Sequence, residues 1–175
     1  MLTKEKIEKE ISNENLKTVK IITFALNIGV ILFAFVCLFL YLNGEGNSND
    51  TQLLDILLGV LFLVASTSYG LSAIIPKKVL VENLKQENPN LIGALTNYQI
   101  MKLAMFEAPA LFGLVIIILG ITNKVIYTND YIFIAIAPLI AMVALSIITF
   151  PSEFRVKSFF KSILDEIQLN KNFKN

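Results

Sequence analysis

The sequence predicts an all-α fold: a polytopic membrane four-helix bundle of two antiparallel transmembrane hairpins, with short cytoplasmic amphipathic helices at both termini. Four apolar stretches of about 19 to 23 residues carry this prediction, at 21–42, 53–75, 103–121 and 131–150. At about 1.5 Å per residue, each can cross the roughly 30 Å hydrocarbon core of a bilayer. Composition agrees, because 55% of the residues are hydrophobic and only 17% are charged, against about 25% charged in an average soluble domain.

The distribution of basic residues predicts the orientation of the chain, because short cytoplasmic loops are enriched in Lys and Arg. Segments 1–20, 76–102 and 151–175 hold five, four and five of them, whereas 43–52 holds none and 122–130 holds one. We therefore expect one membrane domain, residues 1–175, in a bacterial inner (cytoplasmic) membrane with both termini cytoplasmic. The basic residues are Lys4, Lys6, Lys9, Lys17, Lys20, Lys77, Lys78, Lys85, Lys102, Lys124, Arg155, Lys157, Lys161, Lys171 and Lys174.

The two terminal segments are predicted to be helical. Thr3 is suited to cap a first helix with apolar residues on one side, and Ser152, after Pro151, is suited to start a last one. Aromatic residues beside lysines suit helices that lie in the membrane interface. Alternatively, both helices extend their spans into the cytoplasm. The apolar residues concerned are Ile7, Ile11, Leu16, Phe154, Phe159, Ile163 and Ile167.

Proline and asparagine mark the inner connection. Pro76 should end or bend the second span, and Asn88-Pro89-Asn90 indicates a turn before the third helix. That helix should begin near Leu91, well before its apolar stretch. Pro109 removes a backbone donor inside the helix, so a kink is expected there.

Glu107 is the only charged residue inside the third apolar stretch, and it is the main candidate site residue. An ionisable group costs about 2.5 kcal/mol or more at the bilayer centre, which makes it a functional candidate. Three interpretations stay open: Glu107 reaches the cytoplasmic interface, forms a structural hydrogen bond across the bundle, or handles an ion or substrate. Asp55, in the first turn of the second span, is interpreted as structural.

A polar group in the second span, Ser66, Thr67, Ser68 and Tyr69, followed by Ser72, is a possible partner of Glu107. The second span runs inward and the third outward, so these residues and Glu107 should lie at similar depths. Ser and Thr in membrane helices more often bond to their own backbone or allow close helix packing, and this alternative also stays open.

Residues 84–119 resemble part of a known family. Leu84-Lys85-Gln86-Glu87-Asn88-Pro89-Asn90 is similar to the polar loop of the rotary ATPase proteolipid (c) subunit, and Glu107-Ala108-Pro109-Ala110 to its carboxylate segment. The resemblance implies that Glu107 binds and releases a proton or sodium ion. The second span differs, since only Gly59 and Gly70 stand where that family has a glycine-rich helix. The whole chain resembles small four-span bacterial membrane proteins of unassigned function.

Composition also limits the function. The chain has no histidine, no Ser or Cys beside a base and no intramembrane carboxylate pair, so no catalytic activity, cofactor or metal is expected. The net charge of +1 argues against a nucleic-acid partner. Cys37 is expected to pack as a small apolar residue. The predicted function is that of a small membrane subunit or self-associating bundle, with the lipid bilayer, a homo-oligomer or other membrane subunits as partners. The alternative is proton or cation handling by Glu107.

Overall fold

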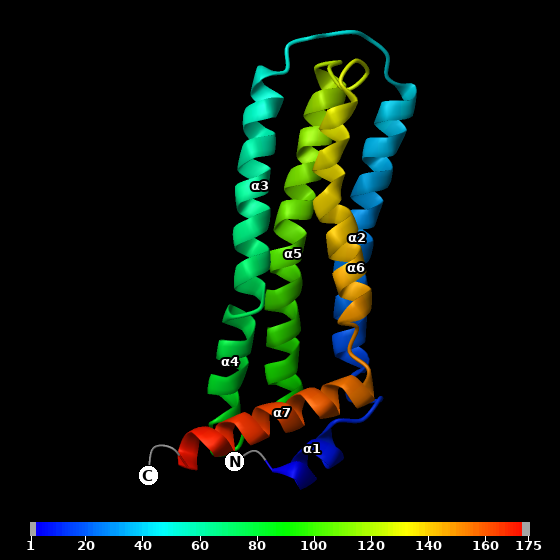
Figure 1. Cartoon of the computed structure of the whole chain (residues 1–175). Helices are drawn as coiled ribbons and strands as arrows, with labels where there is room; N and C mark the ends of the chain where they lie inside the picture. The colour runs from blue at the N-terminus through cyan, green and yellow to red at the C-terminus, as the bar shows by residue number, and fades with distance from the viewer. Residues whose placement is uncertain (1–2, 173–175) are drawn as a thin grey trace.

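The computed structural model describes residues 3–172, so Lys174 of the charge pattern lies outside the described residues. Within this range the chain is helical and contains no strand (Figure 1). Four segments are long and apolar enough to cross a membrane: Lys17–Asn43, Gln52–Leu84, Leu91–Thr122 and Asp130–Ile148. The elements are α1 (Lys4–Glu10), α2 (Lys17–Asn43), α3 (Gln52–Ser72), α4 (Ile75–Leu84), α5 (Leu91–Thr122), the 3₁₀ helix η1 (Asp130–Ile136), α6 (Ala137–Ile148) and α7 (Glu153–Asn172).

The local signals for helix ends are confirmed. The Thr3 hydroxyl accepts a hydrogen bond from the Lys6 N–H (3.2 Å), and the Asn90 side chain accepts one from the Gly93 N–H (2.9 Å). The second span breaks before Pro76, which lies in the first turn of α4. Ser152 precedes α7 and accepts a hydrogen bond from the Arg155 N–H.

The fourth span is not one α-helix, as its apolar stretch alone would suggest. It begins as η1 and becomes α-helical only at Ala137. Pro138 has no N–H to bond the carbonyl of Ile134, and its ring crowds that carbonyl. The 3₁₀ segment spans seven residues, which is longer than the usual three or four.

Helix α5 is the centre of the fold. It packs against α1, α2, α3, α4, η1 and α6, and half of its most apolar window is buried. The first two spans were expected to pack against each other as an antiparallel hairpin, and the structure differs. Helices α2 and α3 are antiparallel, but they lie on different sides of α5 and have little contact with each other in the described part of the chain (Figure 1).

The buried apolar residues form two separate cores. The span core lies among α2, α3, α5, η1 and α6, and the terminal core lies where α1, α4 and α7 meet the starts of α2 and α5. The span core comprises Val30, Cys37, Leu54, Leu61, Phe106, Ala110, Leu114, Ile116, Ile117, Val125, Ile126, Ile132, Ala135 and Met142. The terminal core comprises Ile7, Ile11, Leu16, Val19, Leu80, Leu84, Leu91, Ala94, Leu95, Val156, Phe160, Ile163 and Leu164.

The two terminal helices do not continue the spans. Helix α7 lies across the end of the bundle, beside α1 (Figure 1). Its residues Phe160 and Ile163 are fully buried in the terminal core, as is Ile7 of α1. Only Phe154 of the predicted apolar face remains largely exposed, at 83%. The apolar sides of these helices thus pack mainly on the protein.

Candidate functional site: Glu107 and a buried polar layer

Glu107 lies on the side of α5 that faces α2. The Cys37 thiol of α2 lies 3.8 Å from the Leu114 carbonyl oxygen of α5, and Glu107 lies seven residues, about two turns, before Leu114 on the same helix face. Glu107 is half-buried, and no hydrogen bond or ion pair joins it to another described residue. The intramolecular hydrogen bond of the structural interpretation is therefore absent from the described part of the chain.

The predicted cluster of hydroxyls around Glu107 does not form. Ser66 donates to the Phe62 carbonyl (2.8 Å) and Thr67 to the Leu63 carbonyl (2.8 Å), both within α3. Ser68 is half-buried on the same helix. Ser66 and Thr67 thus bond to the backbone of their own helix, which is the alternative that the sequence left open for them.

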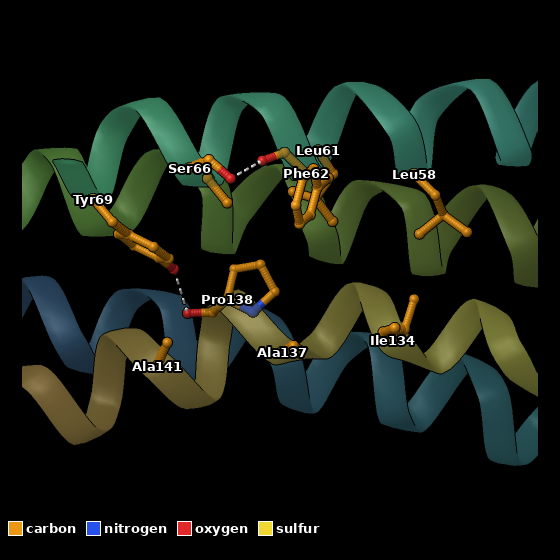
Figure 2. Close-up of a pocket in the computed structure, with 10 residues that line it drawn as sticks. Leu58, Leu61, Phe62, Ser66, Tyr69, Ile134, Ala137, Pro138 and Ala141 are labelled. Carbon is orange, nitrogen blue, oxygen red and sulfur yellow. Dashed lines mark hydrogen bonds between the residues drawn. The ribbon is translucent and has the colours of Figure 1, made fainter. Parts of the chain in front are cut away.

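Tyr69 joins α3 to its neighbours but does not bond Glu107. Its hydroxyl donates to the Pro138 carbonyl of α6 (3.2 Å), as Figure 2 shows. Its ring packs edge-on against Phe106 of α5, with the centroids 5.7 Å apart. Tyr69 therefore links α3, α5 and α6 at one level of the bundle.

Ser66 and Tyr69 border an apolar pocket of about 520 Å³ between α3 and the fourth span (Figure 2). Its other lining residues are apolar, among them Phe62 and Ile134, and Glu107 is not one of them. Because its lining is mostly apolar and one side is open, this pocket suits a hydrocarbon chain and not an ion.

Pro109 is buried within α5, which continues as one helix from Leu91 to Thr122. The kink expected at Pro109 stays a prediction.

Four buried polar residues form a layer, and sequence reasoning singled out only Ser72 among them. Thr23, Ser72, Gln99 and Ser146 belong to α2, α3, α5 and α6, one from each span. None of them belongs to the span core or the terminal core. The polar residues thus occur in the part of each span that lies between the two apolar cores.

Asn27 connects two members of this layer. Its Nδ2 donates to the Ser146 hydroxyl (2.6 Å) and to the Thr23 carbonyl (2.6 Å), which joins α2 to α6. Asn27 is the most polar residue of the first apolar stretch. Its polarity was the feature of the sequence that pointed to the buried layer. Its Oδ1 is buried without a hydrogen-bond partner among the described residues.

Charged residues gather at the end of the bundle that holds the terminal core. Glu8 of α1 pairs with Lys161 (2.6 Å) and Lys157 (3.0 Å) of α7, and Lys157 also pairs with Glu153 (2.8 Å). The hydrogen bonds from Lys161 and Lys157 hold the pKa of Glu8 below its ordinary value. Bonding to Lys157 likewise lowers the pKa of Glu153, and its bonds to Glu153 and Glu8 raise the pKa of Lys157.

Asp55 has a structural contact, in agreement with its interpretation. It accepts hydrogen bonds from Tyr131 at the start of the fourth span (2.6 Å) and from Thr51 (2.8 Å). These bonds fix the start of α3 to η1 at the end of the bundle opposite the termini (Figure 1).

The described residues contain no group of three or more His, Cys, Asp or Glu side chains that could hold a metal ion. The spans thus contain a Glu107 carboxyl without a hydrogen-bond partner among the described residues, and a polar layer in which Asn27 bonds Ser146 and Gln99 Nε2 has no partner among them. Such groups can exchange hydrogen bonds with a neighbour or hold a small polar ligand. In comparisons with known proteins, no family model, no curated protein and no solved structure matches this chain.

Proposed function

We propose that this chain is a non-enzymatic integral membrane protein that self-associates through α5, with Glu107 as the polar focus of the contact. In this proposal the four spans lie in a bacterial inner membrane, and the terminal core with α1 and α7 lies on the cytoplasmic side. The concentration of lysines at that end of the bundle supports this orientation.

The uncovered side of the central helix carries the proposal. Because α2 and α3 are not in extensive contact, a strip of α5 remains exposed between them. Ile100, Ala104, Ala108 and Val115 are exposed and spaced by four, four and seven residues, which places them on one helix face. Small residues such as Ala104 and Ala108 allow a second helix to approach closely in a membrane.

Glu107 lies beside this strip and has no hydrogen-bond or ion-pair partner among the residues that the structure describes. An ionisable carboxyl within the apolar part of a membrane costs about 2.5 kcal/mol or more, and a hydrogen bond from a neighbouring chain offsets part of that cost. A second copy is the occupant that we favour. In a two-fold arrangement the same strip meets itself, and the two Glu107 carboxyls can satisfy each other if one is protonated.

Disulfide cross-linking in the native membrane tests this contact. In a Cys37→Ser background, Ala104→Cys and Ala108→Cys should give covalent dimers. Leu63→Cys, on the exposed side of α3, is the control and should not. Absence of dimers from both α5 variants, under oxidation that cross-links a known dimer, would refute self-association. A cross-link to another protein instead would indicate a hetero-complex.

Substitution of Glu107 tests its role in the same assay. Glu107→Leu should reduce cross-linking at Ala108→Cys several-fold, whereas Glu107→Gln, which keeps a donor and an acceptor, should retain most of it. Because Glu107 forms no hydrogen bond with another residue in the described range 3–172, the leucine variant should change monomer stability by less than about 0.5 kcal/mol. A larger loss of monomer stability would place its role inside the chain.

Single cysteines also test the orientation. In the Cys37→Ser background, a membrane-impermeant thiol reagent added to spheroplasts should label Asn47→Cys and not Lys171→Cys. Permeabilised membranes should label both and provide the control. The reverse pattern in spheroplasts would overturn the cytoplasmic placement of the termini.

Ion exchange at Glu107, which the resemblance to the proteolipid subunit implies, stays a prediction. Neither the pocket between α3 and the fourth span nor the cavity described below includes Glu107 in its lining.

A further inference from the structure

A second polar feature lies at the end of the bundle that holds the termini, away from Glu107. A cavity of about 130 Å³, open on one side, lies between α5, the segment that follows α6 and the start of α7. Its polar lining residues are Tyr98, Gln99, Lys102, Thr149 and Arg155, and no Asp or Glu lines it. The lining therefore has two cations and no acidic residue to balance them.

Gln99 is the most deeply buried polar group of this cavity. It is only 3% exposed, and its Nε2 amide has no hydrogen-bond partner among the described residues. A buried amide donor without a partner costs about 1 to 3 kcal/mol. A ligand that accepts hydrogen bonds would remove this cost.

Lys102 is half-buried and forms no ion pair with a described carboxylate. Its Nζ lies 3.5 Å from the Tyr98 hydroxyl and 5.7 Å from the centre of the Tyr98 ring. Both contacts leave its positive charge unneutralised. The Tyr98 hydroxyl, which accepts from Lys102, keeps its own proton free to donate.

Arg155 supplies the second cation from α7. One of its amino groups donates to the Ile148 carbonyl at the end of α6 (2.7 Å), and an Arg side chain has further donors. Its acidic neighbour Glu153 is already engaged, because its oxygens accept from Lys157 (2.8 Å) and from the Asn13 N–H (3.1 Å).

We infer that this cavity binds a phosphate group between Lys102, Arg155 and the Gln99 amide. A phosphate offers only acceptors, and this donor set matches it. One water takes about 30 Å³ of liquid, so the cavity has room for roughly four water-sized groups, as many as the oxygens of a phosphate. Water alone would satisfy Gln99 but would leave both cations without a counter-charge.

The position of the cavity agrees with two sources of phosphate. Lys102 immediately precedes the third apolar stretch, and Phe150, which also lines the cavity, ends the fourth. This is the level of the lipid headgroups in the proposed topology, where basic pockets between spans bind anionic lipids. A soluble phosphate could enter the same cavity from the aqueous side.

Native mass spectrometry of the full chain in a neutral maltoside detergent tests the site. The probes are short-chain phosphatidylglycerol, short-chain phosphatidylcholine and inorganic phosphate. Phosphatidylglycerol should bind more tightly than phosphatidylcholine. If inorganic phosphate competes at similar concentration, the ligand is a soluble phosphate; if it does not, the ligand is a lipid headgroup.

Substitutions distinguish binding of the anion in this cavity from nonspecific attraction of the anion to basic residues. Lys102→Gln and Arg155→Gln should each weaken binding of the preferred anion about fivefold, and together about 25-fold, as expected for roughly 1 kcal/mol per cation near the membrane surface. Lys102→Arg should retain binding, and Gln99→Leu should weaken it. The matched control is Lys78→Gln with Lys85→Gln, two exposed lysines outside the cavity.

The thermal midpoint measured without anion identifies variants that fold incorrectly. If the glutamine variants fold incorrectly, Lys102→Arg keeps the test valid. Equal affinity of wild type and the double glutamine variant would overturn the inference. An equal loss in the Lys78/Lys85 control would also overturn it, as would equal binding of phosphatidylglycerol and phosphatidylcholine when inorganic phosphate does not bind.

Discussion

Replacing Gly113 by alanine tests the closest contact between α5 and the fourth span. A Cβ at residue 113 would overlap the backbone carbonyl oxygen of Ala135 in η1, and it would also lie 3.2 Å from the carbonyl carbon. The obstacle is backbone, so no side-chain rotation relieves it and the two helices must separate. Overpacking of this kind costs about 1 to 3 kcal/mol, and we expect the upper part of that range.

Gly59→Ala is the matched control, because a Cβ added there has no atom within 4 Å. Both substitutions place alanine inside a helix, so whatever alanine contributes through helix propensity is common to the two variants. The difference in unfolding free energy between them therefore reports the strain alone. Gly120→Ala, whose Cβ would meet only side chains at 3.3 to 3.7 Å, should fall between them.

Unfolding in mixed micelles with increasing sodium dodecyl sulfate, followed by circular dichroism or tyrosine fluorescence, gives these free energies. Gly113→Ala should unfold at a clearly lower detergent fraction than wild type and Gly59→Ala. Equal midpoints for the two alanine variants would refute the close approach of α5 and η1, and with it the packing of the span core around α5.

Two further predictions concern the ends of the bundle. Hydrogen bonds to Lys161 and Lys157 lower the pKa of Glu8 below its ordinary value of 4.5, so their stabilising effect is complete above that pH and is lost as pH falls through the lowered pKa. The protection of α1 amides from hydrogen exchange, relative to a reference peptide at the same pH, should therefore fall in this acid range. Glu8→Gln should already show part of that loss of protection at neutral pH. Identical protection in wild type and variant would contradict the docking of α1 on α7. At the opposite end, a double-mutant cycle of Asp55→Asn and Tyr131→Phe should give a coupling of about 0.5 to 1.5 kcal/mol, whereas strictly additive effects would show that their hydrogen bond contributes nothing.

The sequence predicted the spans and the helix ends because these depend on local chemistry. Length and apolarity define a span, and Thr3, Pro76 and Asn90 act on their own backbone or that of nearby residues. Helix partners were harder to predict. In a lipid environment an apolar residue can face either a helix or a hydrocarbon chain, so hydrophobicity did not distinguish the sides of α2 and α3. Only small residues such as Gly113 marked the face of α5 that contacts η1.

The candidate site was predicted only in part. Glu107 was evident because a charge in an apolar stretch is rare. That it has no partner among the described residues could be known only from the positions of α2 and α3. The rest of the buried layer was missed because Thr23, Gln99 and Ser146 are ordinary polar residues whose depth depends on the packing of other helices. Gln99 in particular lies before its apolar stretch, and only the fold of α7 across the bundle encloses it.

The terminal core also determines the order in which the molecule can be completed. Helix α1 is made before α7, and Glu8 bonds Lys161, which lies 153 residues later in the chain. At about 5 to 20 residues per second of synthesis, Ile7 of α1 waits roughly 8 to 30 s before the apolar side of α7 is available. During that interval all four spans have been made and can enter the bilayer. The end of the bundle therefore closes last, and a ribosome that stops before α7 leaves an inserted protein whose first helix has no partner from α7.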